Sequence, residues 1–331
     1  MKMLEQQIKE KISSLFDSGV ITRALLWTNG EFPYEKTPYV ANSKEELDDM
    51  SYDEFCAGSL LKYLVTESKK EGKILVLLKP CDVYSYNRLV SEHRINADNV
   101  YLLGIACNGK ADIEKIRESG LKGITGIEND EDKLKVKTLY GDKELKFADN
   151  VLAKCNFCKT REFPENIETI GTSEPLSFAK EDDFSDVAKI ESMTPEERFN
   201  FWRHELSKCI RCNACRNICP SCTCETCVFD NPASGISSKA NADDFEENMF
   251  HIIRAFHVAG RCTDCRECSR VCPQNIPLYL LNRKFIKDIN ELYGDYQAGE
   301  TEENRSPLTT FTKSDAEPSV VYERNGGENN A

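Results

Sequence analysis

Two copies of one cysteine pattern stand in the last third of this chain. The pattern is Cys-x2-Cys-x2-Cys-x3-Cys-Pro, where x is any residue. Its first copy contains Cys209, Cys212, Cys215 and Cys219, and its second contains Cys262, Cys265, Cys268 and Cys272. Three thiolates on one tight loop bind three corners of an iron–sulfur cube, while the fourth Cys of such a run binds the neighbouring cube. The spacing therefore predicts two cubes, which carry single electrons.

Each predicted ligand set combines three cysteines of one run with the fourth cysteine of the other run, an arrangement called crosswise here. The first set is Cys209, Cys212, Cys215 and Cys272. The second set is Cys262, Cys265, Cys268 and Cys219.

Zinc and disulfides are the alternatives for cysteines with this spacing. Zinc sites commonly use two Cys pairs, whereas here a third and a fourth Cys follow and a Pro closes each run. Disulfides are typical of exported proteins, and residues 1–16 have neither the apolar stretch nor the cleavage site of a signal peptide. We therefore expect a cytoplasmic protein whose thiols stay reduced and available for iron.

Four cysteines of the N-terminal half predict a third cube. They are Cys81, Cys107, Cys155 and Cys158. Cys81 and Cys107 each follow an apolar run that predicts a strand, and the carboxyl ends of parallel strands meet at one edge of a sheet. The Cys155-x2-Cys158 pair would then come in from a loop. The alternative is that Cys81 and Cys107 are buried as small hydrophobic residues.

The remaining cysteines suggest a fourth cube. They are Cys56, Cys222, Cys224 and Cys227. Sixteen cysteines divide into four groups of four, but Cys56 is far from the others in the sequence. The alternatives are a ligand set shared with a partner subunit or the backbone, and thiols that only tune the neighbouring cube.

Composition excludes several other classes of protein. A chain of 331 residues is long enough for two domains. Its net charge of −13 argues against a nucleic-acid partner, which requires a basic face. No apolar run approaches the ~18 residues needed to cross a bilayer, so direct membrane insertion is not expected.

The elements that would position these cysteines change type along the chain. Residues 1–185 predict an α/β domain with a mostly parallel sheet and one [4Fe-4S] site, because apolar β-rich runs alternate with helical stretches. The predicted strands are 21–27, 74–78 and 100–105, the helices are 59–68 and 111–118, and a hairpin spans 136–148. Residues 160–186 are polar and rich in turns, which predicts an irregular connection.

Residues 186–294 predict a mainly helical domain that holds two [4Fe-4S] clusters. A helix over 196–208 leads to the first cysteine run, and a helix over 243–258 precedes the second. In the latter, Met249, Ile252 and Phe256 are among the residues spaced to form one apolar face. Residues 295–331 are acidic and poor in large apolar residues, which predicts a flexible tail.

The histidines form no pair with the spacing of metal ligands. They are His93, His204, His251 and His257. His204 and His257 lie near the cysteine runs in the sequence, so they are candidates for tuning a cube.

Over roughly residues 20–290 the chain resembles the beta subunit of formate dehydrogenase and the wider beta-subunit family of coenzyme F420 hydrogenases and dehydrogenases. The matching segments are Lys79-Pro80-Cys81-Asp82, residues 94–104, Cys155-x2-Cys158, the seven-cysteine run 209–227 and the run that ends at Cys272-Pro273-Gln274-Asn275. The start of the chain departs from the family, which opens with a Gly-Gly segment that helps to form a flavin pocket. No Gly-x-Gly-x-x-Gly loop occurs anywhere in the sequence.

The resemblance implies an iron–sulfur electron relay that lies beside a formate dehydrogenase or hydrogenase catalytic subunit. Heterodisulfide-reductase-like or flavoprotein subunits are further partners of such relays, and many members bind FAD. It also implies that the N-terminal cluster uses Cys81, Cys107, Cys155 and Cys158. The alternative function is a flavin-containing oxidoreductase that exchanges hydride with a deazaflavin or nicotinamide coenzyme on its own α/β domain.

Overall fold

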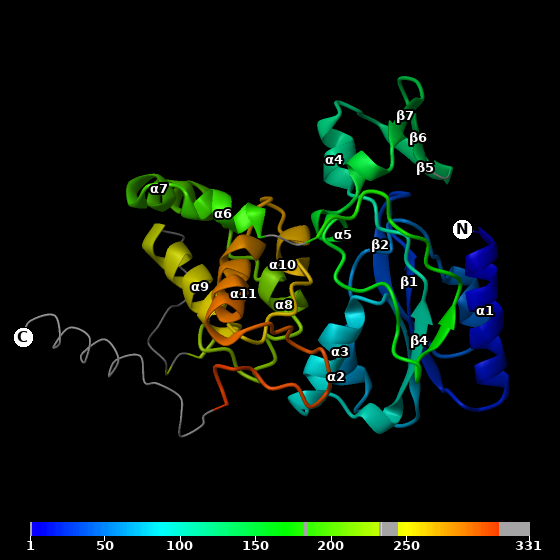
Figure 1. Ribbon diagram of the computed structural model, residues 1–331. Coiled ribbons are helices and arrows are strands. Elements are labelled where there is room, and N and C mark those ends of the chain that lie inside the picture. The colour runs from blue at the N-terminus through cyan, green and yellow to red at the C-terminus, as the bar shows by residue number, and fades with distance from the viewer. Residues whose placement is uncertain (1, 131, 182–183, 232, 234–243, 311–331) are drawn as a thin grey trace, which may run out of the picture.

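The first half of the chain is built on a five-stranded sheet (Figure 1). The computed structural model describes residues 2–130, 132–181, 184–231, 233 and 244–310. In spatial order the strands are β2 (Lys36–Ala41), β1 (Arg23–Asn29), β3 (Ile74–Leu78), β4 (Val100–Ile105) and β8 (Glu168–Ile170). Only β2 is antiparallel to its neighbour, and the other four strands are parallel. The predicted α/β region is therefore confirmed.

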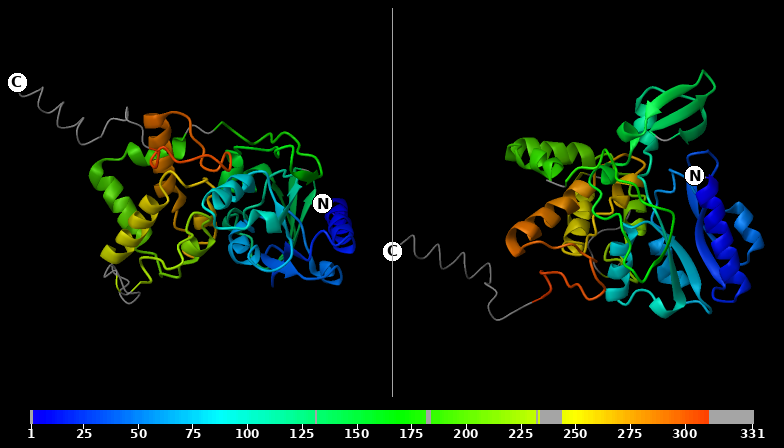
Figure 2. Two further views of the ribbon diagram at one scale, coloured as in Figure 1. Left: turned by 90° about the horizontal axis from the view of Figure 1, so that it is seen from below. Right: turned by 45° about the vertical axis from the view of Figure 1, so that its right-hand side comes forward.

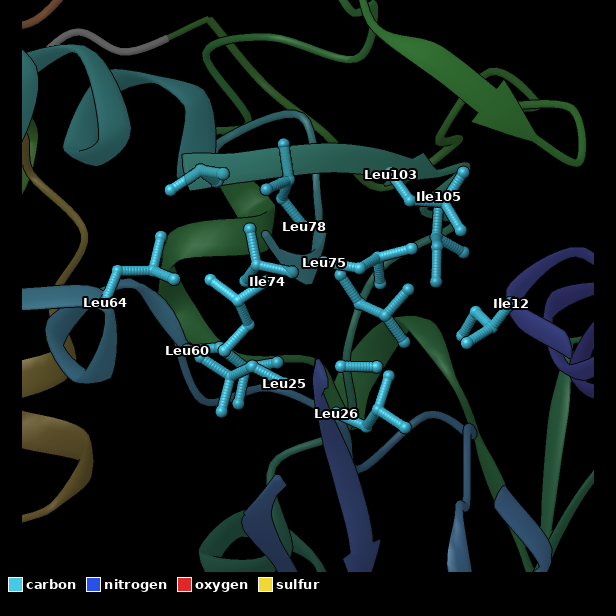
Figure 3. Close-up of a cluster of buried hydrophobic side chains, with 14 of the residues drawn as sticks. Ile12, Leu25, Leu26, Leu60, Leu64, Ile74, Leu75, Leu78, Leu103 and Ile105 are labelled. Carbon is cyan, nitrogen blue, oxygen red and sulfur yellow. The ribbon is translucent and has the colours of Figure 1, made fainter. Parts of the chain in front are cut away.

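Helices on both faces bury the central strands of this sheet. The helices are α1 (Lys2–Asp17), α2 (Leu61–Glu67) and α3 (Asp82–Ser91). All five residues of β3 are buried, as expected for a parallel strand that is covered on both faces. In Figure 3, Ile12 of α1 and Leu64 of α2 approach the sheet from opposite sides. This packing fixes the strand ends that precede Cys81 and Cys107.

A small antiparallel sheet extends from the main one. Its strands are β5 (Ile124–Asp130), β6 (Lys133–Thr138) and β7 (Lys143–Lys146), and it lies near α4 (Ile113–Glu118) and α5 (Ala153–Asn156) (Figure 1). The predicted hairpin corresponds to β6 and β7. The sequence missed β5, and it missed β8 within the expected connection 160–186. The residues of β8, Glu-Thr-Ile, are too few to show a period, and pairing with β4 defines this strand.

The described part of residues 185–293 contains helices and long loops. The helices are α6 (Ser185–Glu191), α7 (Pro195–Leu206), α8 (Ala214–Ile218), α9 (Asp244–His257), α10 (Glu267–Arg270) and α11 (Tyr279–Tyr293). Figure 2 shows them grouped beside the sheet. A capping box formed by Thr194 and Glu197 begins α7, as the sequence predicts. Because cysteine-bearing loops separate these helices, a mainly helical domain remains a prediction. None of the described helices is long and apolar enough to cross a membrane.

Buried and half-buried ion pairs join the two halves of the chain. Glu92, which follows α3, accepts two contacts of 2.6 Å from Arg261 and one of 2.7 Å from Arg88. Glu267 of α10 is fully buried and pairs with Lys154 at 2.9 Å and with Arg270 at 2.7 Å. Burial alone would raise the pKa of Glu267, but these two cations hold it below its ordinary value.

The segment that follows α11 packs against both halves. The Asn87 side chain donates a hydrogen bond of 3.0 Å to the carbonyl of Gly299, and the Tyr296 hydroxyl donates one of 2.9 Å to the carbonyl of Gly260. Gly299 has a φ of +77° and lies against the Tyr84 carbonyl, so a side chain would clash there. The rest of the predicted tail, residues 311–331, lies outside the described residues. The predicted domain borders stay a prediction.

Replacing Glu92 with Gln should loosen the contact between the halves. The variant loses charge-assisted hydrogen bonds to two arginines, each worth about 1.5–3 kcal/mol. We expect a lower apparent Tm in anaerobic thermal scans at one fixed rate. Lys137→Met is the matched control, because the Lys137–Glu128 pair is also 2.6 Å long but exposed, and exposed pairs contribute about 0–1 kcal/mol. Equal Tm values for the two variants would contradict the role of Glu92.

Candidate metal centres

Most of the cysteines line three hollows, here called the first, second and third hollow. The first hollow is lined by Cys209, Cys212, Cys215 and Cys272. The second is lined by Cys262, Cys265, Cys268 and Cys219. The third is lined by Cys81, Cys107, Cys155 and Cys158. The fourth cysteine of each sequence run thus lies in the hollow of the other run. The first and second hollows are similar in size, at about 330 and 350 Å³.

The backbone of the two cysteine runs repeats an uncommon conformation. The residues before and after the second Cys of each run have positive φ angles: Arg211 +54°, Asn213 +61°, Asp264 +57° and Arg266 +55°. Each such residue costs on the order of 1–2 kcal/mol when it is not Gly. The same cost at equivalent positions of both runs indicates that the curvature of the loop itself is required. The short helices α8 and α10 begin directly after these residues and place the third and fourth cysteines.

The first hollow opens to the surface on one side and is buried on the other. Cys212 is exposed and neighbouring Ile210 is 58% exposed. The backbone N–H of Arg211 donates to the Cys209 sulfur at 3.4 Å. At the buried side His251 has neither ring nitrogen hydrogen-bonded within the described residues. Burial lowers the pKa of His251 to about 3, so its ring is neutral.

The second hollow is enclosed. Burial raises the pKa of Cys268 to about 11, and the nearby Arg254 cation opposes this shift. The Asn282 amide donates to the Cys268 sulfur at 3.8 Å. A hydrogen bond from Cys222 lowers the pKa of Cys219, so a cysteine outside the two predicted sets stabilises one of their thiolates.

The third hollow places the four cysteines of its predicted set among four lysines. Cys81 follows β3, Cys107 follows β4, and Cys155 and Cys158 come from α5 and the loop after it. Burial raises the pKa of Cys155 to about 11. The lysines that line the hollow are Lys79, Lys110, Lys154 and Lys159. Lys79 and Lys110 are nearly inaccessible to solvent, so they require anions nearby.

The donor chemistry of the three hollows fits iron–sulfur cubes. Each contains four cysteine sulfurs, and the first also contains a buried imidazole without partners in the described residues. Within the described ranges no group of three or more His, Cys, Asp or Glu is arranged to hold a single metal ion. A cube presents four separate irons, one to each thiolate, and its sulfides accept hydrogen bonds.

The hollows adjoin one another in a row. The second and third share a wall made of Thr263, Asp264, Cys265 and Arg266. The hydroxyls of Ser85 and Thr263 hydrogen-bond at 3.0 Å across the junction between the halves. Cys215 of the first hollow and Cys268 of the second pack in one core cluster, and both thiols raise the pKa of Arg254.

The structure does not bring the fourth predicted set together. Cys56 is completely buried in the core of the first half, where its sulfur contacts the backbone N–H of Asp53 at 3.4 Å and the Ser51 carbonyl at 3.6 Å. Cys222 lies beside Cys219, Cys227 packs against the core of the helical region, and Cys224 is exposed. Cys56 thus packs as a small hydrophobic residue.

Helix α9 turns a different face inward from the one that its apolar residues predict. Met249, Ile252 and Phe256 are 38%, 43% and 62% exposed, whereas His251 and Arg254 are 1% and 3% exposed. The sequence suggested His204 and His257 as tuning residues, but both are exposed. The missed signal was a polar pair spaced three residues apart in an otherwise apolar helix.

The segment that contains both cysteine runs matches a known protein family. Residues 205–276 match the family described as 4Fe-4S dicluster domain. This segment spans both cysteine runs and supports the presence of 4Fe-4S clusters.

Curated relatives cover most of the chain. It is 23% identical to the F420-dependent formate dehydrogenase subunit beta of Methanocaldococcus jannaschii, over 82% of this chain and 86% of the relative. It is 26% identical to the F420-dependent formate dehydrogenase 1 subunit beta of Methanococcus maripaludis, over 65% and 71%. The predicted resemblance is confirmed, and the chain is an iron–sulfur electron-transfer subunit of a redox complex.

A solved structure is also similar in part. The match is to a chain of the F420-reducing [NiFe] hydrogenase complex from Methanosarcina barkeri, with 15% identity and a TM-score of 0.36. It covers 47% of this chain and 62% of that one, so this protein spans less than two thirds of the hydrogenase chain.

Cys56→Ala and Cys107→Ala should affect iron content differently. Cys107 lines the third hollow, so its loss should reduce the iron bound after anaerobic reconstitution. Cys56 only packs in the core, so its variant should bind as much iron as the native chain. Colorimetric iron determination checks this. Loss of iron from Cys56→Ala in protein with native circular dichroism would show that Cys56 is a ligand.

Proposed function

We propose that this protein relays single electrons through three cubes, one in each hollow. The row of adjoining hollows is the observation that carries the proposal. Each hollow is lined by the four cysteines of one predicted set, and Cys265 of the second set also lines the third hollow. The second hollow thus adjoins the third, and its Cys268 packs in one core cluster with Cys215 of the first. When bound, the cubes supply reversible one-electron chemistry, at potentials that proteins set between about −700 and +450 mV.

We infer a defined order along this relay. The second hollow would hold the middle cube of the relay. It shares a wall with the third hollow, and Arg254 interacts with cysteines of both the first and the second. The first hollow is one terminus, since Cys212 and Ile210 are exposed there. An electron partner would therefore approach the Cys212 loop.

The residues around each hollow would hold and tune its cube. The crosswise ligand sets tie the two cysteine runs into one unit, so each cube crosslinks both. Lys79, Lys110 and Lys154 offset the thiolate charge in the third hollow. These side chains exclude water and supply fixed charge while electrons pass.

The partner that the relatives favour is a formate dehydrogenase catalytic subunit. Both curated relatives are beta subunits of F420-dependent formate dehydrogenases. A hydrogenase-type catalytic subunit, or a heterodisulfide-reductase-like or flavoprotein subunit in the cytoplasm, would use the same exposed terminus. Purification of the native complex without oxygen, followed by identification of its other subunits, tests this assignment.

A flavin oxidoreductase is the second candidate, and one observation favours it. An open cleft reaches Cys265 and Lys154, and aromatic side chains of Tyr34, Phe55 and Tyr279 line it. A flavin bound there would lie next to the second and third hollows. Acid treatment of anaerobically purified protein would release yellow flavin in that case, whereas iron and sulfide alone support the relay.

Single ligand substitutions should separate the three cubes by electron paramagnetic resonance. Cys212→Ala should remove the signal of the first hollow, Cys265→Ala that of the second and Cys81→Ala that of the third, because each loses one of four ligands. Dithionite-reduced samples with matched iron analysis provide the measurement. Unchanged iron in Cys212→Ala or Cys265→Ala would refute the dicluster ligands, and loss of all signals in Cys81→Ala would refute a separate third site.

A further inference from the structure

Arg254 is a buried cation with no ordinary partner. It lies on α9 and is 3% exposed. Its Nε, Nη1 and Nη2 atoms make no hydrogen bond to oxygen or nitrogen within the described residues. A guanidinium has five N–H donors and cannot shed its charge. Burying one without acceptors is costly, so a missing acceptor is expected here.

Sulfur surrounds this guanidinium. Burial alone would lower the pKa of Arg254, but the thiols of Cys268, Cys215, Cys219 and Cys222 outweigh burial and raise it. Cys215 lines the first hollow, whereas Cys268 and Cys219 line the second. Cys215 and Cys268 also belong to the core cluster against which Ile253, the residue before Arg254, packs. This one side chain is therefore near ligands of two cubes.

Its neighbours supply donors that are each confined to one hollow. His251, three residues earlier on α9, lines only the first hollow and has two free ring nitrogens in the part of the chain that the structure describes. Asn282 of α11 lines only the second hollow. Arg254 differs from both because it reaches the two sites together.

We propose that Arg254 donates hydrogen bonds to sulfur atoms of both cubes in the dicluster segment and raises both reduction potentials together. This inference rests on the proposed function. A cube becomes more negative on reduction, so a fixed cation and its N–H donors stabilise the reduced form more than the oxidised form. Arg254 keeps its proton while one electron enters or leaves either cube.

The test is a redox titration of the full-length, anaerobically reconstituted protein, followed by electron paramagnetic resonance. Arg254→Gln should shift the midpoint potentials of both dicluster signals to more negative values. The midpoint potential of the cube in the third hollow, which Cys81 lines, should not change. Arg254→Lys keeps the charge but loses the planar fork, so both midpoints should shift in the same direction by less. His251→Phe should move only the signal of the first hollow.

Arg203→Gln on α7 is the matched control, because this exposed arginine lies outside the hollows and should change no midpoint. Unchanged midpoints in an iron-replete Arg254→Gln protein would overturn the proposal, and so would a shift of one dicluster signal alone. If both Arg254 variants lose both cubes but keep the third, the residue is needed for assembly, which overturns the tuning role. Absence of cubes from the native chain would instead refute the proposed function itself.

Discussion

Burying sulfur anions inside a protein is the constraint on which this structure depends. A thiol in a dry pocket keeps its proton, as the raised pKa values of Cys155 and Cys268 show, so thiolates form there only against nearby positive charge. Lys110 and Arg254 are buried beside these cysteines and would be costly without anions. Cation and thiol therefore stabilise one another, and iron completes the balance. The burial of Lys110 and Arg254 therefore fits the cysteine thiols that raise the pKa of each.

The sequence predicted best what depends on local spacing. The crosswise sets follow from the motif, and the convergence of Cys81 and Cys107 follows from two apolar runs that end at one sheet edge. The place of Cys56 could not be predicted, because counting cysteines says nothing about distance, and this residue packs in the core of the first half. Arg254 and His251 were missed because apolar spacing predicted a different buried face of α9. The buried face also contains Phe250, and the thiols near Arg254 favour its charge there.

The cysteine loops contain strained residues that contacts within the protein help to hold. Arg211, Asn213, Asp264 and Arg266 adopt left-handed conformations that no local pattern demands. Arg266 also stacks its guanidinium against Tyr279 at 4.8 Å, which anchors the second loop to the start of α11. The loops are therefore held in shape by protein contacts in addition to any iron. A preformed loop reduces the entropy that metal binding must offset.

The contacts between the two halves gather around the middle hollow. Thr263 binds Ser85, Arg261 binds Glu92 and Glu267 binds Lys154, and all three partners on the C-terminal side lie within or beside the second cysteine run. A hinge between the halves would therefore separate the wall that the second and third hollows share. Electron transfer through a row of sites depends on fixed separations, so placing the interface at the middle site makes the row rigid. The first hollow, where Cys212 is exposed, is lined by residues of the C-terminal half alone.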